Sequence, residues 1–341
     1  MRAAPVFWGE PPGFLASLLS PIGAAYDTAG RLRRTMSRSY RATVPVVCVG
    51  NLVAGGAGKT PVALSLASWL VERGIPVHVV TRGYGGRLPG PVRVDPTRHD
   101  ARAVGDEAVL LATRAPCWVA RDRAAGVRAA VVDGAGAILL DDGLQNPTVA
   151  KTLGLIVVDS GYGFGNGRVI PAGPLRENLR RGLARVDAVV LLAAQGDAAN
   201  GAAGLSPGCE VPVLNAVLAP VNGERLAGMR LLAFAGIARP DKFFAALRAL
   251  STSLVSTRAF PDHHPFRVAE LEALRRDAEL SGARLITTAK DIVRVPSAQQ
   301  SGIEVLDVEV HWSDPTALER LCGRVVQSVD GNRSEPGKHL R

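Results

Sequence analysis

The chain has 341 residues, 47 % of them hydrophobic, and it carries 40 lysines and arginines against 31 aspartates and glutamates, a net charge of +9. This length suggests about two domains, and this hydrophobic content excludes a wholly disordered chain. The positive balance suits acidic partners, namely nucleotides, nucleic acid or an anionic membrane surface, and composition alone does not choose among them.

Residues 1–43 form an apolar segment that becomes basic toward its end. A secretory signal places its charge before the apolar part, which is the reverse order, and no apolar run reaches the ~18 residues that would span a bilayer. An interfacial helix on an anionic leaflet and a helix packed on the protein's own core explain this stretch equally well. The apolar positions recur at roughly helical spacing: Phe14, Leu15, Leu18, Leu19, Ile22 and Tyr26.

From about residue 44, apolar runs alternate with helical segments. Residues 44–52 are β-branched without polar alternation, as expected for a strand buried on both faces. Residues 61–74 follow as a helix with Pro61 near its start and Gly74 at its end. This alternation predicts an α/β fold with a doubly wound, mostly parallel sheet covered by helices on both faces. Further strands are expected at 75–83, 117–120, 137–143, 153–161 and 186–193.

A small, polar, glycine-rich stretch at 193–210 predicts a loop or a domain boundary. Two strand-like runs around Asn222 and Gly223 predict a β-hairpin. The alternation of strands and helices then resumes, with 303–310 as one strand and a last helix from about Pro315. The expected organisation is a P-loop domain over 44–208, a β-hairpin linker over 209–230, a second, smaller α/β domain over 231–325 and a loose polar tail over 326–341.

The cysteines do not suggest a disulfide framework or a zinc site. None of them lies in a C-x-x-C pair or near a metal-like histidine spacing. The pattern fits a reducing compartment. We interpret all four as packing residues: Cys48, Cys117, Cys209 and Cys322.

The segment GNLVAGGAGKTP, residues 50–61, joins the first strand to its helix and predicts a phosphate-binding loop. Lys59 is expected to reach the β- and γ-phosphates, and the Thr60 hydroxyl to bind Mg²⁺. The usual pattern would have a glycine where this chain has Val53. A flexible strand–helix turn explains the sequence less well. The expected cofactor-binding residues are Val53, Ala54, Gly55, Gly56, Ala57, Gly58, Lys59 and Thr60.

The run AILLDDGLQ, residues 137–145, is an apolar strand that ends in two acids. P-loop proteins keep a Mg²⁺-organising aspartate at such a position. Two adjacent acids are costly together unless a cation is present. We therefore expect Asp141 and Asp142 to hold the metal; the alternative is a solvated acidic turn.

Three further motifs carry polar residues whose roles the sequence leaves open. In VGDEAVLL, Asp106 and Glu107 lie at a helix N-terminus, where capping and general-base catalysis are both possible. In FPDHHPF, adjacent histidines follow an acid, which suits either a proton-accepting pair or an ordinary surface loop. In VIPAGPLREN, Arg176 suits either a phosphate contact or a helix-start ion pair.

Taken together, the motifs resemble the tetraacyldisaccharide 4′-kinase family over nearly the whole chain. The resemblance implies transfer of the γ-phosphoryl group of ATP, with Mg²⁺, to the 4′-hydroxyl of a tetra-acylated glucosamine disaccharide 1-phosphate. It also implies two α/β/α domains joined by a two-stranded linker. The motifs occur in one order across residues 50–294: GNLVAGGAGKTP, TRGYGG, GDEA, DDGLQ, PAGPLRE, FAGIARPDKFF, FPDHHPF and TTAKDIVR.

The resemblance also implies roles for individual residues. Asp106 would act with His263, rather than with His264, on the acceptor hydroxyl. Asp141 and Asp142 would lie near Mg²⁺. The substrate or phosphate contacts would be Glu107, Gln145, Arg176, Glu177 and His264.

The chain departs from the family pattern at two positions, Ala108 and Ala289, where the family commonly has proline and glutamate. Because Lys59, Thr60 and Asp106 are present, we expect an active enzyme. The resemblance favours the membrane-interfacial interpretation of residues 1–43, at the cytoplasmic face of the bacterial inner membrane. It implies a lipid substrate and no nucleic acid or obligate protein partner.

Two other classes of protein compete with this interpretation. A P-loop GTPase switch would need a guanine-reading N-K-x-D motif, and residues 288–291, TAKD, match it poorly. A nucleic-acid-binding protein would fit the charge, but only 5 % of the residues are aromatic and no basic–aromatic motif is present.

Overall fold

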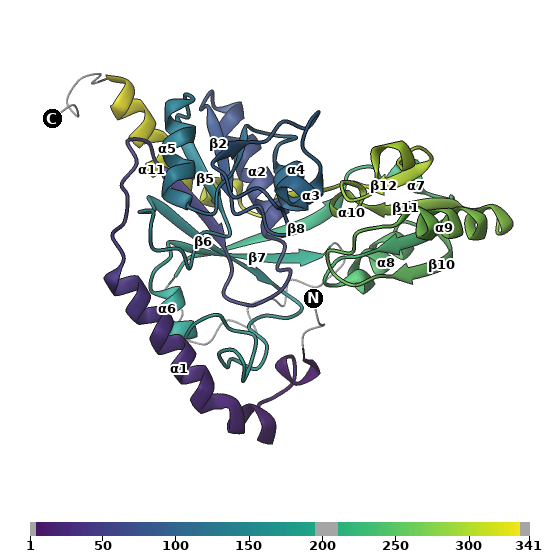
Figure 1. Ribbon diagram of the computed structural model, residues 1–341, viewed down its shortest axis with the longest axis horizontal. Coiled ribbons are helices and arrows are strands. Elements are labelled where there is room, and N and C mark those ends of the chain that lie inside the picture. Colours follow the sequence, from purple (N-terminus) through teal and green to yellow (C-terminus); the bar gives the residue numbers. More distant parts are fainter. Residues whose placement is uncertain (1–4, 195–210, 335–341) are drawn as a thin grey trace.

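The computed structural model describes residues 5–194 and 211–334 and contains two β-sheets, each layered with helices (Figure 1). Cys209, most of the predicted 193–210 loop and the last residues of the predicted tail lie outside the described residues. The other three cysteines are free and buried, as the packing interpretation requires.

The large sheet has nine strands in the order β13-β8-β7-β6-β1-β5-β2-β4-β3. All neighbours pair in parallel except the two edge strands, β3 and β13, which are antiparallel. The predicted doubly wound, mostly parallel sheet is therefore confirmed. Its strands are β1 (Val46–Gly50), β2 (Val77–Thr81), β3 (Val92–Arg93), β4 (Cys117–Val119), β5 (Ala137–Asp141), β6 (Leu153–Asp159), β7 (Ala188–Ala194), β8 (Val213–Pro220) and β13 (Val308–Trp312).

Both faces of this sheet are covered, and β1 shows why its sequence lacks polar alternation. Val47 and Val49 face one apolar cluster, whereas Val46 and Cys48 face the other. The first cluster includes residues of α2, α4 and α11, and the second includes residues of α5. The helices of this domain are α1 (Phe14–Met36), α2 (Lys59–Glu72), α3 (Ala101–Val104), α4 (Asp106–Leu111), α5 (Arg123–Val132), α6 (Leu179–Leu183) and α11 (Pro315–Ser334), with a 3₁₀ turn, η1, at Val6–Trp8.

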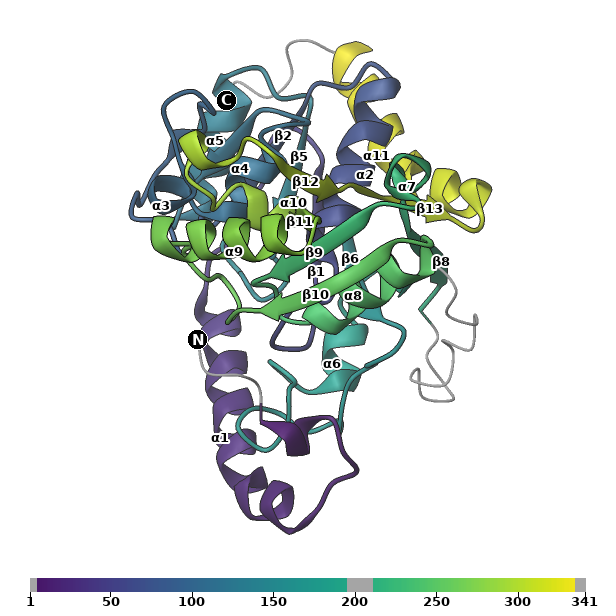
Figure 2. The same cartoon turned by 90° about the vertical axis from the view of Figure 1, so that its right-hand side faces the viewer.

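The small sheet has four parallel strands in the order β10-β9-β11-β12. Phe243, Phe244 and Leu247 of α8 pack on one face, and Leu271 and Leu274 of α9 pack on the other. Figure 2, viewed from the side of the small sheet, shows α8 and α9 with that sheet in front of the large sheet. The elements are α7 (Gly223–Leu226), β9 (Arg230–Ala235), α8 (Pro240–Ala249), β10 (Ser253–Ala259), α9 (Val268–Leu280), β11 (Arg284–Thr288), α10 (Ala289–Ile292), the 3₁₀ turn η3 (Ser297–Gln299) and β12 (Ile303–Leu306).

The predicted hairpin at Asn222 and Gly223 is wrong. β8 pairs with β7 and β13, whereas β9 belongs to the small sheet, so the two runs around Asn222 do not pair with each other. The Asn222 side chain donates to the carbonyl of Val305 and accepts from the amide of Asp307, at 2.8 and 3.1 Å. Asn222 thus holds together the two places where the chain passes from one sheet to the other. The two-stranded connection between the domains consists of β8 and β13.

The C-terminal limit of the small domain was also predicted wrongly. Residues 303–310 were expected to form one strand, but the chain turns at Asp307, and β12 and β13 lie in different sheets. Helix α11 packs on the large sheet through Leu318, Leu321 and Val325. Helical structure continues to Ser334, inside the predicted loose tail.

Helix α1 lies along the outside of the large domain, at the lower left of Figure 1. Its small residue Gly23 faces the 168–170 segment closely, since an added Cβ would lie 2.8 Å from the Val169 carbonyl oxygen. Asp27 of α1 is buried and accepts hydrogen bonds from the Asn178 amide and the Arg181 guanidinium. Over the part of the chain that the structure describes, α1 and the other helices are too short or too polar to cross a membrane.

Candidate active site

The loop between β1 and α2 lies at the point where the sheet order reverses, because β1 is flanked by β5 and β6. Open α/β sheets bind ligands at such a point, beyond the carboxyl ends of the strands. Gly58 has a left-handed backbone (φ +78°), and a Cβ there would lie 2.3 Å from Leu192 Cδ2. Only glycine fits this turn, and α2 begins directly after it, at Lys59.

Val53, the departure from the usual loop pattern, has a structural explanation. It is buried and forms an isolated bridge with Leu175, and the next amide, of Ala54, donates to the Pro174 carbonyl at 2.8 Å. The loop is closed on its inner side by Asn51, whose amide group donates to the Gly55 carbonyl at 3.2 Å. Val53 thus holds the start of the loop against the segment at 174–175.

The two acids at the end of β5 have different partners. Asp141 is 1 % exposed; its Oδ2 accepts from the Thr81 hydroxyl at 3.0 Å, and its Oδ1 is buried without a hydrogen-bond partner. Asp142 has a left-handed backbone (φ +48°). Its carboxylate binds the Arg176 guanidinium at 3.0 Å and lies 3.7 Å from the Lys59 ammonium.

These surroundings set the two pKa values apart. Burial raises the pKa of Asp141 to about 7, and the charges of Glu107 and Asp142 add to the shift. Burial acts in the same direction on Asp142, but Lys59 and Arg176 outweigh it and lower the pKa of that carboxyl. Asp142 is therefore charged at neutral pH, whereas Asp141 requires a further cation to be fully charged.

The residues present fit Mg²⁺. Asp141 Oδ1 is an unsatisfied buried oxygen, and buried polar groups of this kind normally have a partner. Asp142 and the buried Thr60 hydroxyl add two more oxygen donors, the ligand type that Mg²⁺ prefers. Among the described residues no group of three or more His, Cys, Asp or Glu side chains forms a complete metal site. The site therefore suits an ion that also binds phosphate oxygens.

A second cluster of polar side chains joins the two domains. Asp106 begins α4 in the large domain, and His263 follows β10 in the small one; His263 Nδ1 and Asp106 Oδ2 are 2.8 Å apart. His263 has a left-handed backbone (φ +60°), which is uncommon for a non-glycine residue and clusters at functional sites. Asp106 thus pairs with His263 and not with His264, and their joint action on an acceptor hydroxyl stays a prediction.

Lys290 and Arg294 complete this cluster. The Lys290 ammonium lies 3.5 Å from His263 Nε2, and Arg294 Nε lies 3.5 Å from Asp106 Oδ2. Because a carboxylate only accepts, His263 Nδ1 carries the proton that is donated to Asp106. His263 Nε2 lies beside both the Lys290 ammonium and the Asp262 carboxylate, which is 3.8 Å away. Burial would raise the pKa of Asp106, but the hydrogen bond from His263 and the charges of Lys290 and Arg294 outweigh it and lower the pKa.

The remaining predicted contacts divide into two sets. Gln145 and Arg176 stay beside the acids: Arg176 binds Asp142, and Gln145 donates to the Asn51 carbonyl at 3.0 Å. Glu107 lies 3.4 Å from the Lys290 ammonium. Contacts of these three side chains with substrate or phosphate stay predictions.

Glu177 and His264 pair with other residues of the protein. Glu177 is 1 % exposed, and its carboxylate is paired with Arg185, Arg34 and Gln145, so it faces the N-terminal helix. His264 pairs with Glu270 at 2.8 Å and stacks on Phe260. In the structure the Glu177 carboxylate and His264 Nε2 are bonded within the protein, and contacts of these side chains with substrate or phosphate stay predictions.

Sequence reasoning assigned no role to several residues that the structure places here. Lys290 and Arg294 lie in TTAKDIVR, a motif used only for the resemblance. Asp159, at the end of β6, binds Lys242 at 2.6 Å and Arg239 at 3.1 Å, which ties the large sheet to α8. The sequence did contain a signal for these last three residues: Arg239 and Lys242 lie in FAGIARPDKFF, and Asp159 ends an apolar strand.

The phosphate-binding loop, the two acids at the end of the neighbouring strand β5 and the sheet order define a P-loop nucleotide-binding protein. The family model of LpxK, tetraacyldisaccharide-1-P 4′-kinase, matches residues 15–327. The chain belongs to this family.

Two curated relatives and one solved structure agree with this assignment. The tetraacyldisaccharide 4′-kinase of Rhodospirillum centenum is 52 % identical, over 96 % of this chain and 98 % of its own, and that of Rhodospirillum rubrum is 49 % identical, over 95 % and 98 %. The structure of LpxK from Aquifex aeolicus in complex with ATP has a TM-score of 0.73 at 23 % identity, covering 92 % of this chain and 99 % of that one. The last comparison confirms the fold.

Proposed function

We propose that the chain transfers the γ-phosphoryl group of ATP to the 4′-hydroxyl of tetraacyldisaccharide 1-phosphate, giving the tetra-acylated lipid A precursor lipid IVA. Membership of the family over residues 15–327 supports this activity. The observation that carries the mechanism is the Asp106–His263 pair, because it sets a carboxylate from the large domain against the small domain beside the predicted ATP site. The test is transfer of label from γ-labelled ATP to the lipid.

In this proposal Lys59 binds the β- and γ-phosphates, and Arg176 adds a second cation near them. Thr60, Asp141 and Asp142 would hold Mg²⁺, which when bound neutralises charge on the β- and γ-phosphate oxygens. The 4′-oxygen of the sugar forms the new bond to the γ-phosphorus, and the bond to the β–γ bridging oxygen breaks, so ADP leaves.

Asp106 accepts the proton of the 4′-hydroxyl, and His263 holds the Asp106 carboxylate in place through its Nδ1–H. A carboxylate with a lowered pKa is a weak base, but phosphoryl transfer has a loose transition state in which the hydroxyl proton leaves late. Asp106 therefore needs position more than basicity.

We propose further that α1 attaches the enzyme to the cytoplasmic face of the inner membrane. Its outward side carries large apolar residues, among them Phe14, Leu18 and Ile22, which are 84, 61 and 57 % exposed. Its inward side carries Ala16, Gly23 and Asp27, which are buried. A helix whose apolar side faces outward is typical of an interfacial anchor, and its basic end, at Arg33 and Arg34, suits anionic lipid.

Replacing Phe14 and Leu18 by serine is expected to weaken binding to anionic vesicles about 30-fold or more, since each exposed side chain would lose its burial in lipid. ATP affinity should not change, because neither residue lies near the loop. Flotation with vesicles measures the first quantity, and nucleotide titration the second.

The matched control replaces Val132 and Leu280, which are each 89 % exposed on other elements, by serine. This pair should float like the wild type. Equal vesicle binding by the Phe14/Leu18 variant would contradict attachment through α1.

A further inference from the structure

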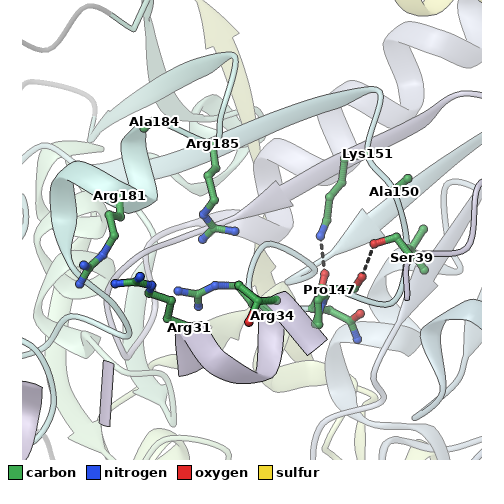
Figure 3. Close-up of a pocket in the computed structure, with 12 residues that line it drawn as sticks. Arg31, Arg34, Ser39, Pro147, Ala150, Lys151, Arg181, Ala184 and Arg185 are labelled. Atoms are coloured by element: carbon green, nitrogen blue, oxygen red, sulfur yellow. Dashed lines mark hydrogen bonds between the residues drawn. The ribbon is translucent and has the colours of Figure 1, made fainter. Parts of the chain in front are cut away.

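A cavity of about 560 Å³ lies between α1, α6 and the loop that precedes β6 (Figure 3). Among the described residues, those that line it include no acidic side chain. Figure 3 shows guanidinium groups from α1 and from the α6 region turned toward the same space, with a lysine on the other side. The basic lining residues are Arg31, Arg34, Lys151, Arg181 and Arg185.

Protein carboxylates neutralise only part of this charge. Glu177 binds Arg34 and Arg185, and Asp27 binds Arg181. Arg31 forms no ion pair with any described carboxylate. Lys151 donates to a backbone carbonyl, that of Asn146, which carries no formal charge. Five cations therefore share two carboxylates around one cavity, an arrangement that attracts an anion.

The pKa of Lys151 agrees with an anion site in this cavity. Burial lowers the pKa of its ammonium against the opposing effects of Cys48 and Glu177, and the nearby charge of Arg185 lowers it further. An anion in the cavity would offset both effects, because it would stabilise the charged form of the lysine.

We propose that this cavity binds the phosphate group of an anionic membrane phospholipid. Guanidinium groups bind phosphate oxygens in pairs, and a basic pocket beside a membrane-facing helix suits a lipid head group. The volume is within the range of ordinary ligand sites. The assignment rests on the proposed attachment of α1 to the membrane.

The position of the cavity on α1 favours a lipid over a soluble anion. Arg31 and Thr35, one turn apart, line the cavity, whereas the intervening Leu32 and the next residue, Met36, are exposed by 60 and 76 %. A helix that lies in the interface buries its apolar side among the acyl chains and leaves its flank at the level of the head groups. The cavity opens on that flank.

The test measures phospholipid retained by the full-length protein in a nonionic detergent, using native mass spectrometry with phosphatidylglycerol, phosphatidylcholine or inorganic phosphate added. The variant Arg31→Gln/Lys151→Gln removes the two cations that bind no carboxylate, so the contacts of Asp27 and Glu177 stay intact. The control, Arg248→Gln/Arg276→Gln, removes the same charge from exposed residues of α8 and α9, outside the lining. The single variant Arg31→Gln, at an exposed position, provides the answer if the double variant does not fold.

We expect one retained phosphatidylglycerol in the wild type and the control, about 10-fold weaker retention in Arg31→Gln/Lys151→Gln, and a smaller loss in Arg31→Gln. Equal retention by all variants, or equal retention of phosphatidylcholine, would overturn the proposal. Displacement of the lipid by equimolar inorganic phosphate would overturn the lipid assignment, because the cavity would then be a site for a soluble anion. None of these readings requires turnover, so a failed kinase assay would leave the result intact.

Discussion

Asp106→Asn is expected to lower kcat for phosphoryl transfer by about 10²- to 10⁴-fold, the usual contribution of a positioned general base. The asparagine has the same shape and still accepts the hydrogen bond from His263, but its oxygen does not take up the hydroxyl proton. Because Asp106 lies at the start of α4 and outside the phosphate-binding loop, the Kd for ATP should stay the same.

The measurement pairs steady-state transfer with an ATP titration on the same preparation. Glu272→Gln, an acid-to-amide change at an exposed position of α9, is the control and should match the wild type in both. Wild-type turnover in Asp106→Asn would remove Asp106 from the mechanism.

Asp141→Asn is expected to separate stability from activity. Transfer should fall by about 100-fold or more, because a Mg²⁺ ligand that stabilises transition-state charge contributes several kcal/mol. In the absence of Mg²⁺ and nucleotide, the same variant should unfold at a higher temperature than the wild type, by about 3 °C or more at pH 8.

The sign of the second effect follows from the raised pKa. A carboxyl whose pKa is about 7 in the folded state and near 4 in the unfolded state binds more protons when folded. The free energy of unfolding of the wild type therefore falls as pH rises from about 4 to 7, and the loss is complete above that range. Asparagine does not ionise, so the variant lacks this loss.

Thermal unfolding at pH 5 and pH 8 checks the claim without any activity assay. The difference in Tm between the variant and the wild type should be larger at pH 8. A variant less stable than the wild type at pH 8 would show that Asp141 is not an uncompensated buried charge.

The large sheet was predictable because each of its central strands is marked locally. β1 and β5 are continuous apolar runs, and a glycine-rich turn or an acid pair follows them directly. Such signals depend on neighbouring residues only. The phosphate-binding loop and the two acids were found for the same reason.

The connection between the domains was not predictable in this way. An Asn-Gly pair between apolar runs favours a hairpin, yet Asn222 bonds to Val305 and Asp307, more than 80 residues away. The run at 303–310 has uniform strand character, and only the position of Asp307 between two sheets divides it. Both errors arise where tertiary contacts outweigh local preference.

The same limit applies to the site. Sequence patterns identified Glu177 and His264 as polar residues in the right motifs. The exposure of only 1 % for Glu177 and the Glu270 partner of His264 become visible only in the folded chain. Lys290 lies 27 residues after His263 along the chain and meets it across the small domain. Spacing does not report such pairs.

The central claim is tested most directly by locating the phosphate in the product. The full-length enzyme is incubated with γ-labelled ATP, Mg²⁺ and detergent-dispersed tetraacyldisaccharide 1-phosphate, and the position of the new phosphate on the sugar is determined. We expect label on the 4′-oxygen with the wild type, and none with Lys59→Ala, which lacks the ammonium that binds the phosphates. Unlabelled lipid from a protein that binds ATP, or label at another hydroxyl, would contradict a 4′-kinase.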